Sequence, residues 1–323
     1  MHIVAVTGIT GKSGQHLLKR MMRERDAVRD YRFILICREQ TAHSANPAGH
    51  ALVEEALSCP GLNLCAARAD LNDSSALRTI FRQYHADFLL HLAGVDFSPS
   101  VVRAALDSGI RNLILVHTTG IYSKYKAAGE LYRQIEAEIG RMTDACRAEG
   151  RPASVTILRP TMIYGDLHDR NISVFIRMVD HLRLFPTVSG GAYDLQPVWC
   201  KDLGNAYFDV LMNWEKTQGR EYILSGGKPI QLIELFRVIE RQLGVRNHYF
   251  SCPFPLAYAG AWVIYLLTFT KIDLREKVQR LVEPRAFDHE AAAADFGYAP
   301  ADFETGVREE IELYRRAKGK KNG

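Results

Sequence analysis

The 323-residue sequence has no pair of cysteines at CxxC spacing and no cluster of histidine and cysteine with the spacing of zinc ligands. Its eleven histidines are scattered, so we expect no metal site. Its cysteines are scattered too, which predicts free thiols in a reducing compartment and no disulfide framework. The six are Cys37, Cys59, Cys65, Cys146, Cys200 and Cys252.

The sequence also has little excess of charge of either sign. The net charge is only +4, and much of it lies in a basic tail at 316–323. No basic face interleaved with aromatic residues is present elsewhere, which argues against nucleic-acid binding. A GxSxG hydrolase elbow is absent as well. The first residues enter a strand pattern without the basic start of a secretory signal, so we expect a cytoplasmic protein.

One segment has no charge at all. Residues 253–270, "PFPLAYAGAWVIYLLTFT", include two prolines near their start. A helix here would have only about fifteen residues, which is short for crossing a bilayer. We expect a buried helix or one covering an apolar substrate pocket, with a peripheral membrane contact as the alternative.

Apolar runs of strand length alternate with helical patterns through the first half of the chain. Near-continuous apolar strands that alternate with helices are typical of a parallel sheet covered on both faces. The sequence therefore predicts an α/β, doubly wound fold, which binds ligands at the carboxyl ends of its strands. The runs are 3–7, 33–37, 62–69, 88–94 and 113–117.

The first strand leads into a glycine-rich loop, "TGITGKSG", residues 7–14. Gly8 permits the tight turn, Gly11 lets the backbone approach a pyrophosphate, and Gly14 lets helix and strand pack closely. We expect Thr10, Lys12 and Ser13 to contact the cofactor with them. No glycine precedes Gly11 by five residues, so the loop is not a P-loop and a dinucleotide is the better ligand.

The end of the second strand bears on the choice of cofactor. Arg38 stands where a carboxylate would hold the ribose 2′-hydroxyl of NAD, and Glu39 follows it. An arginine at this point accommodates a 2′-phosphate, and Lys12 offers a second cation. The sequence therefore favours NADP, with NAD left open.

Several motifs together resemble the extended and atypical short-chain dehydrogenase/reductases, the NAD(P)-dependent epimerase/dehydratase family. The most specific of them is "LRPTMIYG" at 158–165. The resemblance covers nearly the whole chain in the family's order. The other motifs are the glycine loop, "ADLND" (69–73), "HLAG" (91–94), "LQPVWCKDLGNA" (195–206), "YILSGGKPIQLIELFRVIERQLG" (222–244) and "DFGYAPADFETGVREEI" (295–311).

The resemblance implies a division into two interleaved parts. Residues 1–165 would form a Rossmann-type dinucleotide-binding domain, to which 195–226 return. Residues 166–194 and 227–315 would form a smaller, interleaved C-terminal substrate lobe.

The resemblance also implies roles for single residues. Asp70 would bind the adenine, with Leu71 beside it. Along the rest of the cofactor would lie Ala93, Gly94, Pro160, Thr161 and Met162. Arg170, Asn171 and Arg177 are candidates for a substrate phosphate, because an arginine fork matches phosphate oxygens; an exposed, charged helix start is the alternative.

The catalytic residues are harder to assign. Tyr122 and Lys126 reproduce the family's Tyr-x-x-x-Lys, in which the lysine lowers the pKa of the tyrosine, and Thr118 matches its Ser/Thr. However, "VHTTGIY" also resembles a strand-end segment whose tyrosine is not catalytic. In extended members the catalytic tyrosine follows much later, so a shortened loop either recruits this pair or has lost the usual chemistry.

Three functions therefore stay open. The first is an NAD(P)-dependent oxidoreductase, epimerase or dehydratase acting on a nucleotide sugar or a related carbonyl or hydroxyl compound. The second is a non-catalytic NADP-binding sensor or assembly protein. The third is a hydroxysteroid-like dehydrogenase whose pocket is lined by residues 253–270. The partner we expect is a small-molecule substrate, with homodimer formation left open.

Overall fold

The computed structural model describes residues 1–38, 46–124, 127–268 and 273–319. Its central element is a seven-stranded sheet in the order β11-β6-β5-β4-β1-β2-β3, with every neighbouring pair parallel. This confirms the predicted doubly wound α/β fold. The strands are β1 (His2–Thr7), β2 (Tyr31–Cys37), β3 (Leu64–Arg68), β4 (Phe88–His91), β5 (Asn112–Val116), β6 (Ser154–Pro160) and β11 (Glu221–Leu224).

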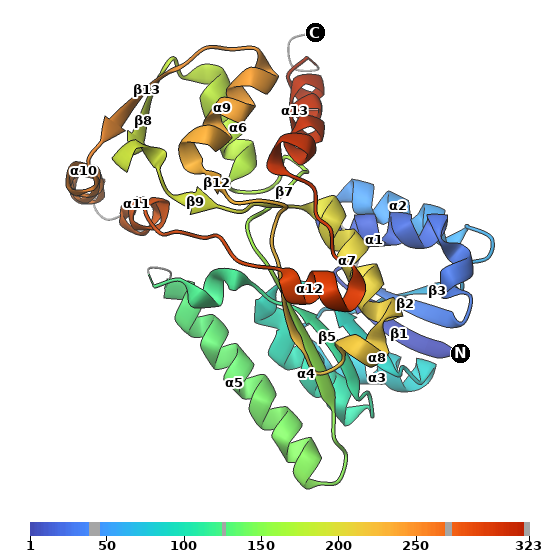
Figure 1. The fold of residues 1–323 in the computed structure, drawn as a ribbon. Coiled ribbons are helices and arrows are strands. Elements are labelled where there is room, and N and C mark those ends of the chain that lie inside the picture. Colours follow the sequence, from blue (N-terminus) through green and yellow to red (C-terminus); the bar gives the residue numbers. More distant parts are fainter. Residues whose placement is uncertain (39–45, 125–126, 269–272, 320–323) are drawn as a thin grey trace.

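Helices cover both faces of this sheet (Figure 1). Alternate residues of a strand point to opposite faces, so Val4 and Val6 belong to one core and Ala5 to the other. The first core is covered by α1 (Lys12–Arg23), α2 (Pro47–Leu57), α7 (Cys200–Met212) and α12 (Glu290–Phe296). The second is covered by α3 (Ser74–Tyr84), α4 (Ser98–Asp107) and α5 (Ala127–Ala148).

A third core lies in the smaller lobe (Figure 1). Its helices α6 (Ile172–His181), α9 (Leu232–Leu243) and α13 (Phe303–Gly319) pack around Phe185, Phe236 and Val307. The chain enters this lobe through β7 (Ile163–Tyr164), which pairs with β10 (Val198–Trp199). The outer strands β8 (Leu184–Val188) and β13 (His248–Cys252) are paired in parallel.

The uncharged segment forms α10 (Phe254–Leu267) at the outer end of this lobe, beside α11 (Arg275–Leu281). Only Ala261 of its 14 residues is buried. The expectation of a buried helix is therefore wrong, because α10 packs mainly against α11 and contributes no residue to the three cores. Across the ranges that the structure describes, no helix combines the length and apolarity needed to cross a membrane.

Candidate functional site

The glycine loop between β1 and α1 has the geometry that a dinucleotide requires. Gly8 has φ +75°, and a Cβ atom there would lie 2.5 Å from the backbone nitrogen of Ala93, just after β4. A Cβ atom at Gly14 would lie 2.6 Å from the carbonyl oxygens of Gly8 and Ile9. Both contacts are too close for any side chain, so both positions need glycine.

The amino end of α1 is left free for an anion. Gly11 is exposed and is the N-cap residue, so no side chain caps the helix, and the first turn holds no acidic residue. The first N–H groups of a helix have no partner within it, and they lie at the positive end of its dipole. This end therefore fits the pyrophosphate of a dinucleotide.

Neighbouring side chains hold the loop in place. The Thr10 carbonyl accepts hydrogen bonds from Asn46 Nδ2 at 2.6 Å and Gln15 Nε2 at 3.1 Å. Lys12 Nζ lies 3.5 Å from Asp166 Oδ1, in the chain that leaves for the smaller lobe. Ser13 is buried. Side chains from outside the loop thus support its backbone and one of its charges.

The residues expected at the adenine end follow β2 and β3. Arg38 is exposed directly after β2, while Glu39 lies outside the described residues. Asp70 is also exposed, and its Oδ1 accepts a hydrogen bond from Asn72 N at 2.8 Å; Leu71 is buried. Because these strands are adjacent and parallel, their ends meet at one edge of the sheet.

The residues expected at the nicotinamide end follow β4, β5 and β6 at the same edge. Gly94 is exposed there. Thr118 Oγ1 accepts a hydrogen bond from Gly120 N at 3.0 Å and caps the 3₁₀ turn Thr119–Tyr122. Thr161 N donates to the Leu224 carbonyl at 3.2 Å, and the Met162 carbonyl accepts from Val198 N at 2.9 Å. All the predicted cofactor contacts remain predictions, but the fold brings them to one edge.

Tyr122 does not have the environment of a ready proton acceptor. Its hydroxyl donates to Glu221 Oε1 at 2.6 Å, and its ring lies 5.9 Å from that of Phe287. Partial burial and this hydrogen bond raise the pKa of Tyr122 to about 12. Its predicted partner, Lys126, lies outside the described residues.

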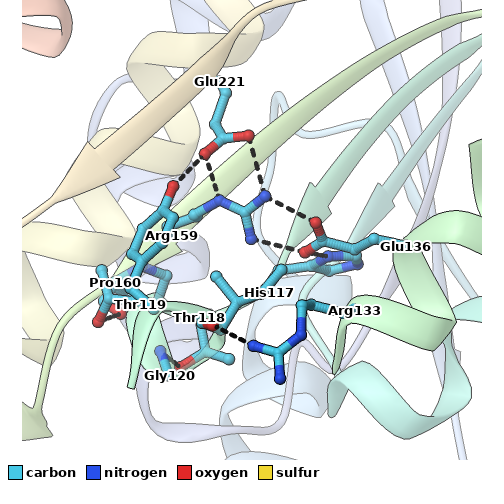
Figure 2. Close-up of polar contacts among 11 residues, drawn as sticks. His117, Thr118, Thr119, Gly120, Arg133, Glu136, Arg159, Pro160 and Glu221 are labelled. Carbon is cyan, nitrogen blue, oxygen red and sulfur yellow. Dashed lines mark hydrogen bonds and ion pairs between the residues drawn. The ribbon is translucent and has the colours of Figure 1, made fainter. Parts of the chain in front are cut away.

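Arg159 is buried and joins Glu136 and Glu221 in an ionic network (Figure 2). Glu221 is the member of this network that binds Tyr122. The Arg159 guanidinium binds both oxygens of Glu136, at 2.6 and 2.8 Å, and both oxygens of Glu221, one of them at 2.9 Å. His117 Nδ1 lies 2.8 Å from Glu136 Oε1. Although burial opposes ionisation, the bonds from Arg159 and His117 lower the pKa of Glu136 to about 2.

The sequence interpretation missed this network as a unit. It assigns Arg159 only to the motif "LRPTMIYG" and gives no role to Glu136, which lies on α5. Glu221 comes from β11, which pairs with β6. None of the motifs named above connects either carboxylate with Arg159. Only the order of the strands in the sheet brings Glu221 close to Arg159.

The three residues expected to meet a substrate phosphate lie at α6. Asn171 precedes the helix, and Arg170 and Arg177 are exposed. The Arg177 guanidinium lies 3.3 Å from Ser173 Oγ. Asp169, two residues before the N-cap Asn171, accepts a hydrogen bond from Ser173 N at 3.1 Å. Both arginines are therefore available to an anion, and their role stays a prediction.

Comparison with known proteins agrees with this architecture. The family model described as "NAD dependent epimerase/dehydratase family" matches residues 4–223. No curated protein matches the chain.

Solved structures match over nearly the full length. One is gox2253, with 19% sequence identity and a TM-score of 0.71; the match covers 98% of this chain and 99% of that one. Another is UDP-glucose 4-epimerase from Thermotoga maritima with UDP-glucose, with 17% identity and a TM-score of 0.66; the match covers 98% of this chain and 99% of that one. UDP-glucuronic acid 4-epimerase from Bacillus cereus, in complex with UDP-glucuronic acid and NAD, also matches. It has 13% identity and a TM-score of 0.68, and the match covers 98% of this chain and 99% of that one. At these identities the likeness shows the fold alone.

Proposed function

Because the chain belongs to the NAD-dependent epimerase/dehydratase family, we propose that it binds NAD or NADP along the carboxyl edge of its sheet and acts on a nucleotide sugar or a related carbonyl or hydroxyl compound. The observation that carries the proposal is the glycine loop, in which Gly8 and Gly14 have no room for a side chain. The uncapped amino end of α1 fits the pyrophosphate beside it. The nicotinamide, once bound, would supply hydride transfer.

Residues after β5 would act on the substrate. Thr118 accepts a hydrogen bond from Gly120, so its own hydroxyl hydrogen can be donated to a substrate oxygen. Tyr122 keeps its proton at neutral pH, since its pKa is about 12. To donate that proton to a carbonyl oxygen, its hydroxyl would have to leave Glu221. Tyr122 is therefore proposed as a proton donor whose hydroxyl is released from Glu221 when the substrate binds.

A nucleotide sugar is supported by the family and by the exposed arginines of α6. Arg170 and Arg177 offer two cations in the smaller lobe to a diphosphate. Cofactor choice is less constrained: Arg38 supports NADP, while the family description names NAD.

One observation favours a second candidate, a dinucleotide-binding protein without dehydrogenase chemistry. Glu136, Arg159 and Glu221 form a closed ionic network, and Tyr122 is bound to it through Glu221. A tyrosine held in this way has neither a lowered pKa nor a free hydroxyl.

The variant Tyr122→Phe separates the two candidates. If Tyr122 transfers the proton, kcat for NAD(P)(H)-dependent conversion of UDP- and dTDP-sugars should fall about 10²–10⁴-fold, with the dinucleotide Kd unchanged. The control is Tyr84→Phe, at the carboxyl end of α3 and so at the opposite edge of the sheet. Turnover that survives Tyr122→Phe would exclude proton transfer by Tyr122. Tight dinucleotide binding without turnover of any of these sugars would favour the second candidate.

A further inference from the structure

The largest concentration of exposed apolar side chains in the described part of the chain lies on α10. Its exposed large residues range from 39% accessible (Ile264) to 74% (Leu267). They are Leu256, Trp262, Val263, Ile264, Leu266 and Leu267. This set, which we name the α10 surface, is unlike the scattered exposed leucines found on any soluble domain.

The breadth of the α10 surface indicates what covers it. At about 100° per residue, the exposed positions of α10 occupy roughly 200° of the helix circumference. They include no polar side chain. A single packed helix usually covers a stripe of about 100°, which would leave half of this surface in water. A lipid phase contacts the whole arc at once.

The length and the charge of the segment agree with a lipid phase. Fourteen residues extend about 21 Å, less than the roughly 30 Å of a bilayer core, so α10 would lie in one leaflet. Residues 241–276 contain four Lys or Arg (Arg241, Arg246, Lys271 and Arg275) against two carboxylates, Asp273 and Glu276, and Asp273 pairs with Arg275. Such a charge balance suits an anionic membrane surface.

The side chains at the margin of α10 also fit an interface. The Arg275 guanidinium carbon lies 4.3 Å from the ring centre of Trp262 and 3.9 Å from that of Tyr265. Amphipathic rings and cations with apolar stems collect where hydrocarbon meets lipid headgroups. Trp262, Tyr265 and Arg275 would therefore lie at the level of the lipid headgroups, with the rest of the α10 surface in the hydrocarbon.

We propose that the α10 surface inserts into one leaflet of an anionic membrane and docks the protein there through its smaller lobe. The inference goes beyond the proposed function and does not depend on it, because α10 shares no residue with the candidate site. It would place the enzyme at a membrane surface without any span.

The test is co-sedimentation of the full chain with vesicles of phosphatidylcholine alone or mixed equally with phosphatidylglycerol. The wild type should bind, and bind the mixed vesicles more tightly. Leu266→Glu together with Leu267→Glu should weaken binding at least about tenfold, since both side chains would leave the hydrocarbon. The matched control is Leu313→Glu, an exposed leucine of α13 that should leave binding unchanged.

A second measurement needs no variant. Trp262 fluorescence in the wild type should be quenched by lipids carrying a doxyl group on the acyl chain. Protein that stays in the supernatant with both vesicle types overturns the proposal, as does equal binding by the double variant. Failure to bind vesicles, together with dimers in sedimentation velocity that the double variant abolishes, would make the α10 surface a contact between two copies and likewise overturn it.

Discussion

Glu310 is a carboxylic acid with no exposure to solvent, on α13 of the smaller lobe. Its Oε1 accepts a hydrogen bond from Leu167 N at 3.1 Å, where the chain leaves the large sheet. Burial, and then the neighbouring carboxyl of Asp169, raise the pKa of Glu310 to about 9. The group is therefore protonated at neutral pH in the folded protein.

This raised pKa predicts a pH dependence of stability. Between about pH 5 and 8, Glu310 is ionised in the unfolded chain and protonated in the folded chain. Its contribution to the free energy of unfolding therefore falls as pH rises, by on the order of 1 kcal/mol per pH unit. Glu310→Gln cannot ionise and should lose this slope, becoming more stable relative to wild type at pH 8 than at pH 5. Urea unfolding across this range measures it; parallel curves would contradict it.

At the scale of elements, the crossing of α1 and α7 depends on a glycine. A Cβ atom at Gly204 would lie 2.5 Å from His16 Cβ and 2.6 Å from Leu17 N. The motif "LQPVWCKDLGNA" contains Gly204 but offers no signal for this contact, because the two helices lie far apart in the sequence. The hydrogen bond between Arg20 of α1 and Asn205 of α7 spans 185 residues.

Two glycine substitutions test this packing. Gly204→Ala should push α7 away from α1 and lower the free energy of unfolding by about 1–3 kcal/mol. The control is Gly140→Ala in α5, where a Cβ atom would meet nothing within 4 Å. It should raise stability by about 0.5–1 kcal/mol, because alanine loses less backbone entropy in a helix. Denaturant unfolding compares them, and equal effects would remove the steric explanation.

For the whole molecule, dinucleotide binding should stabilise the folded chain. A ligand at 100 times its Kd adds about 2.7 kcal/mol, which corresponds to several degrees in Tm. We expect a Tm increase with NAD⁺ or NADP⁺, measured by thermal unfolding. Arg38→Ala should reduce the increase with NADP⁺ more than that with NAD⁺ if Arg38 binds the 2′-phosphate. If Arg38→Ala reduced the Tm increase equally with NAD⁺ and NADP⁺, Arg38 would have no role in selecting between the two cofactors.

The sheet and its helices were predictable because they depend on local patterns. The runs around residues 3–7, 33–37, 88–94 and 113–117 became strands close to the predicted positions, since an apolar run between turn signals has few alternatives. β4 ends at His91, three residues before the end of the predicted run, and the chain then passes close to Gly8 at Ala93. The need for glycine at positions 8 and 14 also followed from the loop motif.

The environment of Tyr122 and the exposure of α10 were decided only by tertiary structure. The motif around Tyr122 could not reveal that β11 brings Glu221 to its hydroxyl, nor that this contact raises its pKa. An uncharged segment likewise cannot show whether other elements cover it. Local sequence determines backbone pattern and residue chemistry, whereas pKa and burial depend on groups that only the folded chain brings together.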